Sequence, residues 1–244
     1  TSAPVHAPHA RPGQAAGPAP ETAAAPTTAK ARSSARSGSD STVLRHLLSL
    51  ADLAPTDLTR LLSRAAEVKG APESFASAMR GRSGILLFEK DSLRTRCSFE
   101  VGIHCLGGHA MYMDHSKQRI GVRESLADYA RNLDRYFGLI VARVFEHATV
   151  RGLAEHSSVP VINALCDRHH PCQALADFLT IAEHLHRSAP RRTDVGSLGD
   201  LRRLRLAYVG EPNNVSNSLL HAAALSGATM TLVAPPGCGF DRQI

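Results

Sequence analysis

Side chains that bind anions follow directly after an apolar run. Residues 85–88 are apolar, and Ser92, Arg94 and Thr95 come next, at the start of a stretch with the length of a helix. The first N–H groups of a helix are unpaired and lie at the positive end of its dipole, so such a junction attracts anions. Two hydroxyl donors and a planar guanidinium matched to phosphate oxygens strengthen that attraction. The segment predicts a phosphate site. The alternative is that Ser92 only caps the helix and the arginines are solvated.

A second polar segment carries His170 and Gln173 between an apolar run at 159–162 and another helix-length stretch. Arg143 ends a third apolar run, at 139–144. The carboxyl ends of parallel strands meet at one edge of a sheet, so these three strand ends are predicted to supply a single site. His170 and Gln173 can donate to an anion or a carbonyl oxygen there. Capping and packing is the alternative role of this segment.

A third segment, with Asn213 and Asn214, follows an apolar run at 204–209. An asparagine between a strand and a helix is usually a cap. The other use of this pair is to bind a ligand between two lobes of the molecule.

The elements that must position these residues alternate along the chain. Short apolar runs bounded by turn residues predict buried strands, and helix-length stretches lie between them. The predicted strands are 85–88, 139–144, 159–162, 204–209 and 229–234, and the predicted helices include 95–106, 123–137, 173–186 and 215–226. Apolar residues at helical spacing from 43 to 68, most of them leucines, predict two further helices, with Pro55 and Asp57 marking the start of the second. This order predicts an α/β fold with a mainly parallel sheet and flanking helices.

The predicted organisation has four parts. Residues 1–40 are rich in Ala, Pro, Ser and Thr and form a disordered tail. A first domain spans 41–187, and a linker rich in Arg, Gly, Ser and Asp spans 188–203. Residues 204–244 hold only the first β-α-β of a second, Rossmann-like domain, whose open sheet edge lacks partners.

Composition excludes several classes of protein. Hydrophobic residues make up 43% and charged residues 20%, as in globular chains. No apolar run reaches the roughly 18 residues of a membrane-spanning helix. The net charge is +6, of which the tail carries +2, and aromatic residues are only 5%. This weak surplus suits a small anionic substrate, and the few aromatic rings argue against nucleic-acid binding.

The five cysteines are odd in number and include no C-x-x-C pair, so reduced thiols are expected. The tightest possible metal cluster combines Cys166, His169, His170 and Cys172. Pro171 interrupts it and no second half-site follows, so no metal site is predicted.

Together these segments resemble the aspartate/ornithine carbamoyltransferase family, and within it the ornithine carbamoyltransferases. The resemblance runs from Leu44 to the end of the chain. F-E-K-D-S-x-R-T-R-C-S-F-E at Phe88 to Glu100 and H-P-C-Q-A-L-A-D at His170 to Asp177 are specific motifs. Q-x-x-G-x-x-E-S from Gln118 and G-x-x-N-N from Gly210 agree in order and spacing.

The resemblance implies a first domain that binds carbamoyl phosphate and a reaction that needs no metal or organic cofactor. The residues it assigns to that site are Ser92, the backbone of Leu93, Arg94, Thr95, Arg143, His170 and Gln173. Asn214 corresponds to the asparagine that contacts the amino-acid substrate. Gln118 corresponds to a residue that reaches a neighbouring subunit's site, which implies a homotrimer or a multiple of one.

The implied activity is transfer of the carbamoyl group to the side-chain amine of L-ornithine, a step of arginine biosynthesis or of the urea cycle. Thr95, Arg143 and His170 are expected to stabilise the oxyanion, while Ser92 and Arg94 hold the leaving phosphate.

The sequence departs from the family pattern in two places. Leu93 stands where most ornithine enzymes have threonine, at a position that contributes mainly a backbone N–H. The segments D-x-W-x-S-M-G, which grips ornithine, and H-C-L-P, which orients the amine, do not occur. The chain is therefore expected to be C-terminally incomplete. A non-catalytic homologue that binds carbamoyl phosphate, and a transferase for another amine or an acylated ornithine, stay open as alternatives.

A cytoplasmic location is expected, with organelle import through the tail as its alternative.

Overall fold

A computed structural model describes residues 46–188, 198–241 and 244 of the chain. The α-helices in this part are α1 (Pro55–Gly70), α2 (Leu93–Cys105), α3 (Leu126–Leu133), α4 (His147–His156), α5 (Pro171–Ser188) and α6 (Asn214–Ser226). The strands are β1 (Ser83–Phe88), β2 (His109–Asp114), β3 (Leu139–Arg143), β4 (Val161–Leu165), β5 (Arg205–Val209) and β6 (Thr229–Val233). Three short 3-10 helices are η1 (Leu50–Asp52), η2 (Pro72–Phe75) and η3 (Leu198–Arg203).

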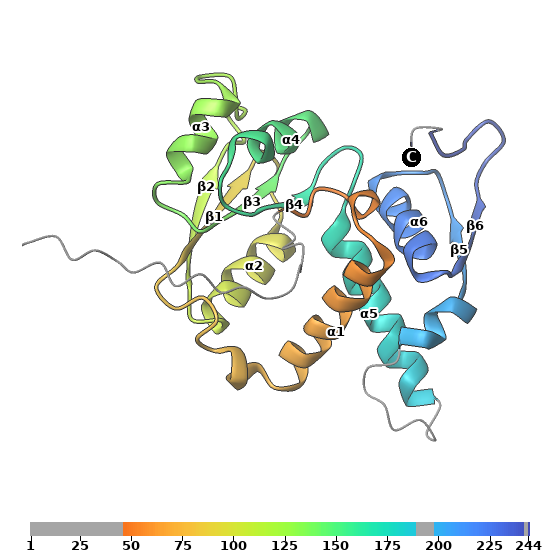
Figure 1. The fold of residues 1–244 in the computed structure, drawn as a ribbon. Helices are drawn as coiled ribbons and strands as arrows, with labels where there is room; N and C mark the ends of the chain where they lie inside the picture. Colours follow the sequence, from red (N-terminus) through yellow and green to blue (C-terminus); the bar gives the residue numbers. More distant parts are fainter. Residues whose placement is uncertain (1–45, 189–197, 242–243) are drawn as a thin grey trace, which may run out of the picture. The chain divides into compact units, whose positions relative to one another are not determined.

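The first sheet has the strand order β2-β1-β3-β4, and all its pairs are parallel (Figure 1). Its register sets Phe88 of β1 opposite Asp114 of β2 on one side and Arg143 of β3 on the other. The carboxyl ends of β1, β2 and β3 therefore lie at one edge of the sheet. The segments that follow these strands begin at that edge.

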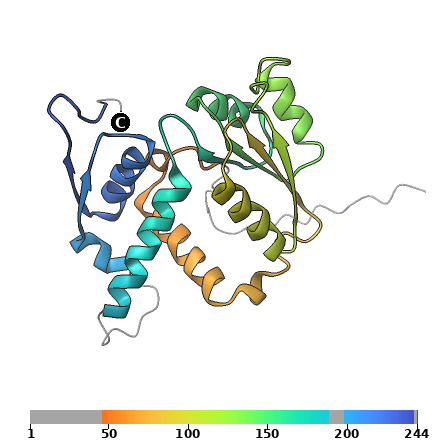
Figure 2. The same ribbon diagram turned by 180° about the vertical axis from the view of Figure 1, so that it is seen from behind.

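Alternating residues of β1 face opposite layers of helices. Ile85 and Leu87 belong to a core shared with α3 and α4, whereas Leu86 and Phe88 pack with α2. The two views of the chain show α2 on the other side of the sheet from α3 and α4 (Figures 1 and 2). Because side chains alternate along a strand, a continuous apolar run is required when both faces are covered.

The second sheet consists of β5 and β6, which are parallel and joined by α6. A separate helical core lies beside it and includes Leu58 and Leu62 of α1, Phe178 of α5 and Ala222 of α6. From Val43 to Ile244 the chain forms one compact unit. None of the described helices is long and apolar enough to cross a membrane.

The predicted α/β fold is confirmed. The five predicted strands are found with small shifts of their ends, and so are the predicted helices 95–106, 123–137, 173–186 and 215–226. One strand and one α-helix were not predicted. Strand β2 lies at the sheet edge and is partly exposed, so its sequence His-Ala-Met-Tyr-Met-Asp lacks a clear apolar pattern. Helix α4 has no side-chain cap at its N-terminus and a mixed composition.

The prediction of the first of the two leucine-rich helices is wrong within the described residues. Leu47 instead pairs with Ile162 of β4, donating to the Val161 carbonyl at 2.9 Å and accepting from the Asn163 N–H at 2.8 Å. Between Leu47 and the start of α1, only η1 is helical. Strand β4 is the last strand of the sheet, so its outer backbone groups need partners, and pairing with Leu47 outweighs the local helical spacing.

The predicted boundaries at 1–40, 41–187, 188–203 and 204–244 stay predictions. The tail at 1–40 and most of the linker lie outside the described residues. Within the linker range, Leu201 is 2% exposed and belongs to the helical core.

Candidate functional site

Helix α2 begins shortly after β1 ends. Ser92 is its N-cap and has an extended backbone, with φ −163° and ψ 107°. The Ser92 hydroxyl accepts a hydrogen bond from the Thr95 N–H at 3.3 Å and donates one to Thr95 Oγ1 at 2.9 Å. Leu93, the first residue of the helix, is 78% exposed. The first turn of α2 thus presents backbone donors and two hydroxyls beside the strand ends.

Arg143 ends β3 and lies next to this turn. Its Nη1 is 3.4 Å from Thr95 Oγ1. Burial in the first place, and then the charge of Arg94, lower the pKa of Arg143 below its ordinary value. Its Nε is buried and has no hydrogen-bond partner among the described residues. Arg94 is exposed. Within the described residues, neither Arg94 nor Arg143 forms an ion pair with a carboxylate. This positive charge favours an anionic ligand.

His170 lies between β4 and α5, directly before Pro171. Burial, and second the charge of Arg143, lower the pKa of His170 to about 4, so its imidazole is neutral at physiological pH. Its Nδ1 is buried and makes no hydrogen bond to any described residue. A neutral imidazole has one N–H to donate and one lone pair to accept a proton.

Helix α6 holds the segment that carries His170. The His170 N–H donates to Ser218 Oγ at 2.8 Å, and Asn217 Nδ2 donates to the Arg168 carbonyl at 3.0 Å. Asn214 Nδ2 donates to the Cys166 carbonyl at 2.6 Å. No role was predicted for Asn217 and Ser218. The signal for them is the run of polar residues at the start of an otherwise apolar helix.

The predicted site residues fall into two groups. The first group contains Ser92, Arg94, Thr95, Arg143 and His170. Ser92, Thr95 and Arg143 are joined by hydrogen bonds, the charge of Arg94 acts on Arg143, and the charge of Arg143 acts on His170. Gln118, Gln173 and Asn214 have no recorded hydrogen bond to that group within the described chain. Gln118 is exposed between β2 and α3, and the Gln173 amide donates to Asp177 of its own helix at 2.9 Å.

The first group has the chemistry of a site for an acyl phosphate. Two guanidinium groups, two hydroxyls and a helix N-terminus suit a phosphate dianion. A neutral imidazole and an unpaired arginine Nε can donate to an oxygen that gains negative charge during the reaction.

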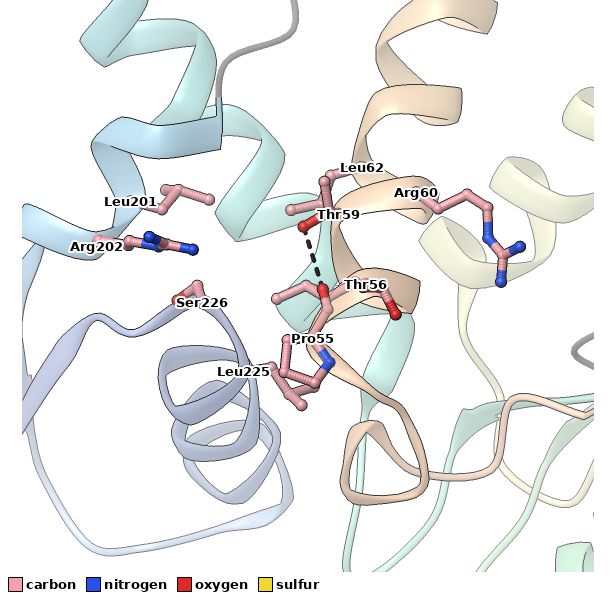
Figure 3. Close-up of a pocket in the computed structure, with 10 residues that line it drawn as sticks. Pro55, Thr56, Thr59, Arg60, Leu62, Leu201, Arg202, Leu225 and Ser226 are labelled. Carbon is pink, nitrogen blue, oxygen red and sulfur yellow. Dashed lines mark hydrogen bonds between the residues drawn. The ribbon is translucent and has the colours of Figure 1, made fainter. Parts of the chain in front are cut away.

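A cavity of about 430 Å³ lies elsewhere, between α1, η3 and the end of α6 (Figure 3). Pro55, Leu62, Leu201 and Leu225 supply apolar walls, and Arg60 is paired with Asp57 at 2.6 Å. None of the residues of the first group lines this cavity. Its size therefore says nothing about where an acyl phosphate binds.

The cysteines and histidines after β4 do not form a ligand cluster. Cys166 Sγ lies 3.4 Å from His147 Nδ1, while the Cys172 thiol donates to the Asn163 carbonyl at 3.7 Å. In the described residues no three His, Cys, Asp or Glu side chains could hold a metal ion.

The chain is similar to proteins of one family. A profile described as "Aspartate/ornithine carbamoyltransferase, carbamoyl-P binding domain" matches residues 45–183. The ornithine carbamoyltransferase of Moritella profunda is 47% identical over 201 residues, which cover 82% of this chain and 62% of that protein. The mitochondrial ornithine carbamoyltransferase of Coccidioides immitis is 43% identical over 207 residues, covering 82% of this chain and 59% of the other.

Solved structures agree in fold. The ornithine carbamoyltransferase of Thermus thermophilus superposes with a TM-score of 0.72 at 43% identity, covering 83% of this chain and 66% of that one. The chain spans less than two thirds of the length of the curated relatives it matches. A profile match over more than half of the residues, together with these identities, shows that the chain belongs to the aspartate/ornithine carbamoyltransferase family.

Proposed function

We propose that the chain is an ornithine carbamoyltransferase. It transfers the carbamoyl group of carbamoyl phosphate to the side-chain amine of L-ornithine and yields L-citrulline and phosphate. Relatives at 43% to 47% identity that bear this name support the proposal.

One observation carries the proposal. Arg143 combines a hydrogen bond to Thr95, electrostatic contact with Arg94 and His170, and a buried Nε that no described residue binds. A buried polar atom normally has a partner. A bound oxygen of carbamoyl phosphate supplies that partner and offsets the repulsion between the two guanidinium groups.

The proposed reaction starts when the neutral amine attacks the carbamoyl carbon. A C–N bond forms, negative charge grows on the carbamoyl oxygen, and the C–O bond to phosphate breaks. The amine loses one proton, which leaves with the product hydrogen phosphate. Thr95, Arg143 and His170 stabilise the oxygen while its charge develops, because they are fixed before the reaction begins.

Ser92, Arg94 and the N–H groups at the start of α2, including that of Leu93, hold the leaving phosphate. Gln173 completes the carbamoyl phosphate site from α5. These positions lower the barrier mainly by fixing the donor in one orientation. Because carbamoyl phosphate is already activated, no cofactor takes part.

Asn214 is proposed to contact the amino-acid substrate from the start of α6. Gln118 is proposed to reach the site of a neighbouring copy, so that the working assembly is a homotrimer or a multiple of one. The exposure of Gln118 supports this role, since the described part of its own chain does not cover it. Light scattering on the purified chain tests the assembly, and a monomer at micromolar concentration contradicts it.

The activity is tested by incubating the chain with carbamoyl phosphate and L-ornithine and measuring citrulline and phosphate. Equal amounts of both products are expected. Calorimetry with carbamoyl phosphate alone reports the first binding step. Binding without citrulline identifies a non-catalytic homologue, and turnover only with other amines or an acylated ornithine identifies a different acceptor.

A cytoplasmic location is also proposed. All five cysteines are free thiols, as expected in a reducing compartment. Relatives named as mitochondrial make import through residues 1–40 the competing proposal. A fluorescent protein carrying residues 1–40 reports which of the two holds.

A further inference from the structure

Glu89 is a buried acidic residue at the end of β1 with no assigned role. The residue is 3% exposed. Oε1 accepts a hydrogen bond from the Ile120 N–H at 2.9 Å, and Oε2 accepts one from the Phe145 N–H at 2.8 Å. A buried carboxylate is tolerated only when hydrogen bonds replace its hydration, and here two backbone amides do so.

The two amides belong to the segments that carry Arg143 and Gln118. Phe145 follows Arg143 by two residues, and Ile120 follows Gln118 by two residues. The backbone of Glu89 adds a third link, because its N–H donates to the Arg143 carbonyl at 2.9 Å. Glu89 also precedes Ser92 by only three residues. The side chain and the backbone of Glu89 therefore join the end of β1 to the segments that carry Arg143 and Gln118.

Other contacts of the Gln118 segment are more exposed. The Arg119 guanidinium lies 4.5 Å from the centre of the Phe145 ring and pairs with Glu146 at 2.8 Å. These two charged side chains are 51% and 61% exposed, and exposed ion pairs contribute little. His115 Nδ1 lies 3.1 Å from the Gln118 carbonyl, to which it donates, because a carbonyl only accepts. Among these contacts, the carboxylate of Glu89 is the buried one.

We propose that Glu89 is a positioning residue of the anion site, holding the Arg143 strand end and the Gln118 segment in one fixed relation to β1. This inference rests on the proposed function, because it assigns Glu89 a part in binding carbamoyl phosphate. Glu89 itself acts through Arg143 and Gln118.

The variant Glu89→Gln tests this role in the full chain. Glutamine has the same shape, but its NH₂ group turns a donor toward one of the two amides that need an acceptor. Hydrogen exchange at the Ile120 and Phe145 amides is expected to become about 10-fold faster, and the affinity for carbamoyl phosphate about 10-fold weaker, as the loss of one buried hydrogen bond predicts. NMR and calorimetry measure the two effects.

Asp134→Asn is the matched control. The Asp134 carboxylate also accepts from a backbone N–H and a hydroxyl, those of Ser158 and Ser157, but near the opposite edge of the first sheet. This control is expected to lower the unfolding temperature while leaving the affinity and the exchange at Ile120 and Phe145 unchanged. A purely structural role of Glu89 predicts a lower unfolding temperature for Glu89→Gln with an unchanged affinity for carbamoyl phosphate, and that result overturns the proposal.

Glu89→Asp keeps both acceptor oxygens and is the second variant for this test if Glu89→Gln does not fold. Because aspartate is one methylene shorter, a smaller loss of affinity with the same pattern of exchange is expected. Unchanged exchange and affinity in this variant also overturn the positioning role. A wild-type chain that binds neither carbamoyl phosphate nor inorganic phosphate contradicts the proposed function instead, and the exchange comparison still decides whether Glu89 holds the two segments.

Discussion

Arg94 and Arg143 place two positive charges near each other at one edge of the first sheet. The charge of Arg94 contributes to lowering the pKa of Arg143, so the two groups repel in the free chain. A phosphate dianion between them converts repulsion into attraction. These side chains therefore contribute to ligand binding more than to folding.

Arg94→Ala is expected to weaken carbamoyl phosphate binding by about 100-fold, because charge-assisted hydrogen bonds contribute about 1.5 to 3 kcal/mol. The unfolding temperature should stay the same or rise slightly, since one repulsive charge is removed. Arg64→Ala is the control, because Arg64 is exposed on α1, where it forms an ion pair with Glu67 and lies 5.8 Å from the centre of the Phe75 ring, away from the anion site. Calorimetry and thermal unfolding measure both, and normal binding by Arg94→Ala contradicts our placement of the anion site.

Buried histidines predict a pH-dependent stability. His169 is 6% exposed and lies between the rings of His147 and His221. Burial in the first place, and then the charge of His147, lower the pKa of His169 to about 4. The unfolded chain binds a proton near pH 6.5, so the free energy of unfolding falls as the pH drops from about 6.5 to 4, by at most about 1.4 kcal/mol per pH unit for each such histidine.

His169→Phe is expected to reduce this slope by about one proton, because phenylalanine keeps an apolar ring and does not titrate. Urea unfolding between pH 7.5 and 4.5 measures the slope for both proteins. Equal slopes show that His169 does not titrate on unfolding.

The turn from α2 to β2 depends on glycine. Gly107 has φ +82°, and a Cβ there lies 2.3 Å from the Ala76 carbonyl oxygen. Gly107→Ala is therefore expected to lower the free energy of unfolding by about 2 to 4 kcal/mol. Gly102→Ala, inside α2 with nothing within 4 Å of the added carbon, is expected to raise it by about 0.5 to 1 kcal/mol. Denaturant unfolding checks both signs, and a shared sign contradicts this account of the turn.

Strand β1, which is buried on both faces, could be predicted, and the partly exposed edge strand β2 could not. The run Ile85, Leu86, Leu87 and Phe88 is fully apolar because helices cover both sides of β1. Strand β2 is half-exposed at the sheet edge, and no comparable constraint acts on its residues. The segment around Leu47 has helical spacing, but its backbone pairs with β4. The residues around Leu47 do not by themselves indicate that β4 is their partner.

The helical core joins elements from distant parts of the chain. Phe178 of α5 is fully buried among residues of α1, α6 and η1. Since residues from Val43 onward form one compact unit, this core is expected to stabilise both sheets.

Phe178→Ala is expected to lower the free energy of unfolding by about 3 to 5 kcal/mol, because it leaves a cavity in a packed core. Tyr136→Ala, at a residue that is 74% exposed, should change it by less than about 0.5 kcal/mol. Amide exchange is expected to accelerate in both β3 and β5. Acceleration in β5 alone indicates two independently unfolding domains.

Types and spacing of residues alone predicted the α/β class, the strand ends that carry Ser92, Arg143 and His170, and the family resemblance. They did so because buried strands must be apolar and because helix starts after such strands attract anions. The sequence did not show that Glu89 joins two distant amides, and the polar start of α6 did not reveal that Ser218 binds the backbone of His170. Those contacts link residues 31 to 56 positions apart, so only the folded chain brings them together.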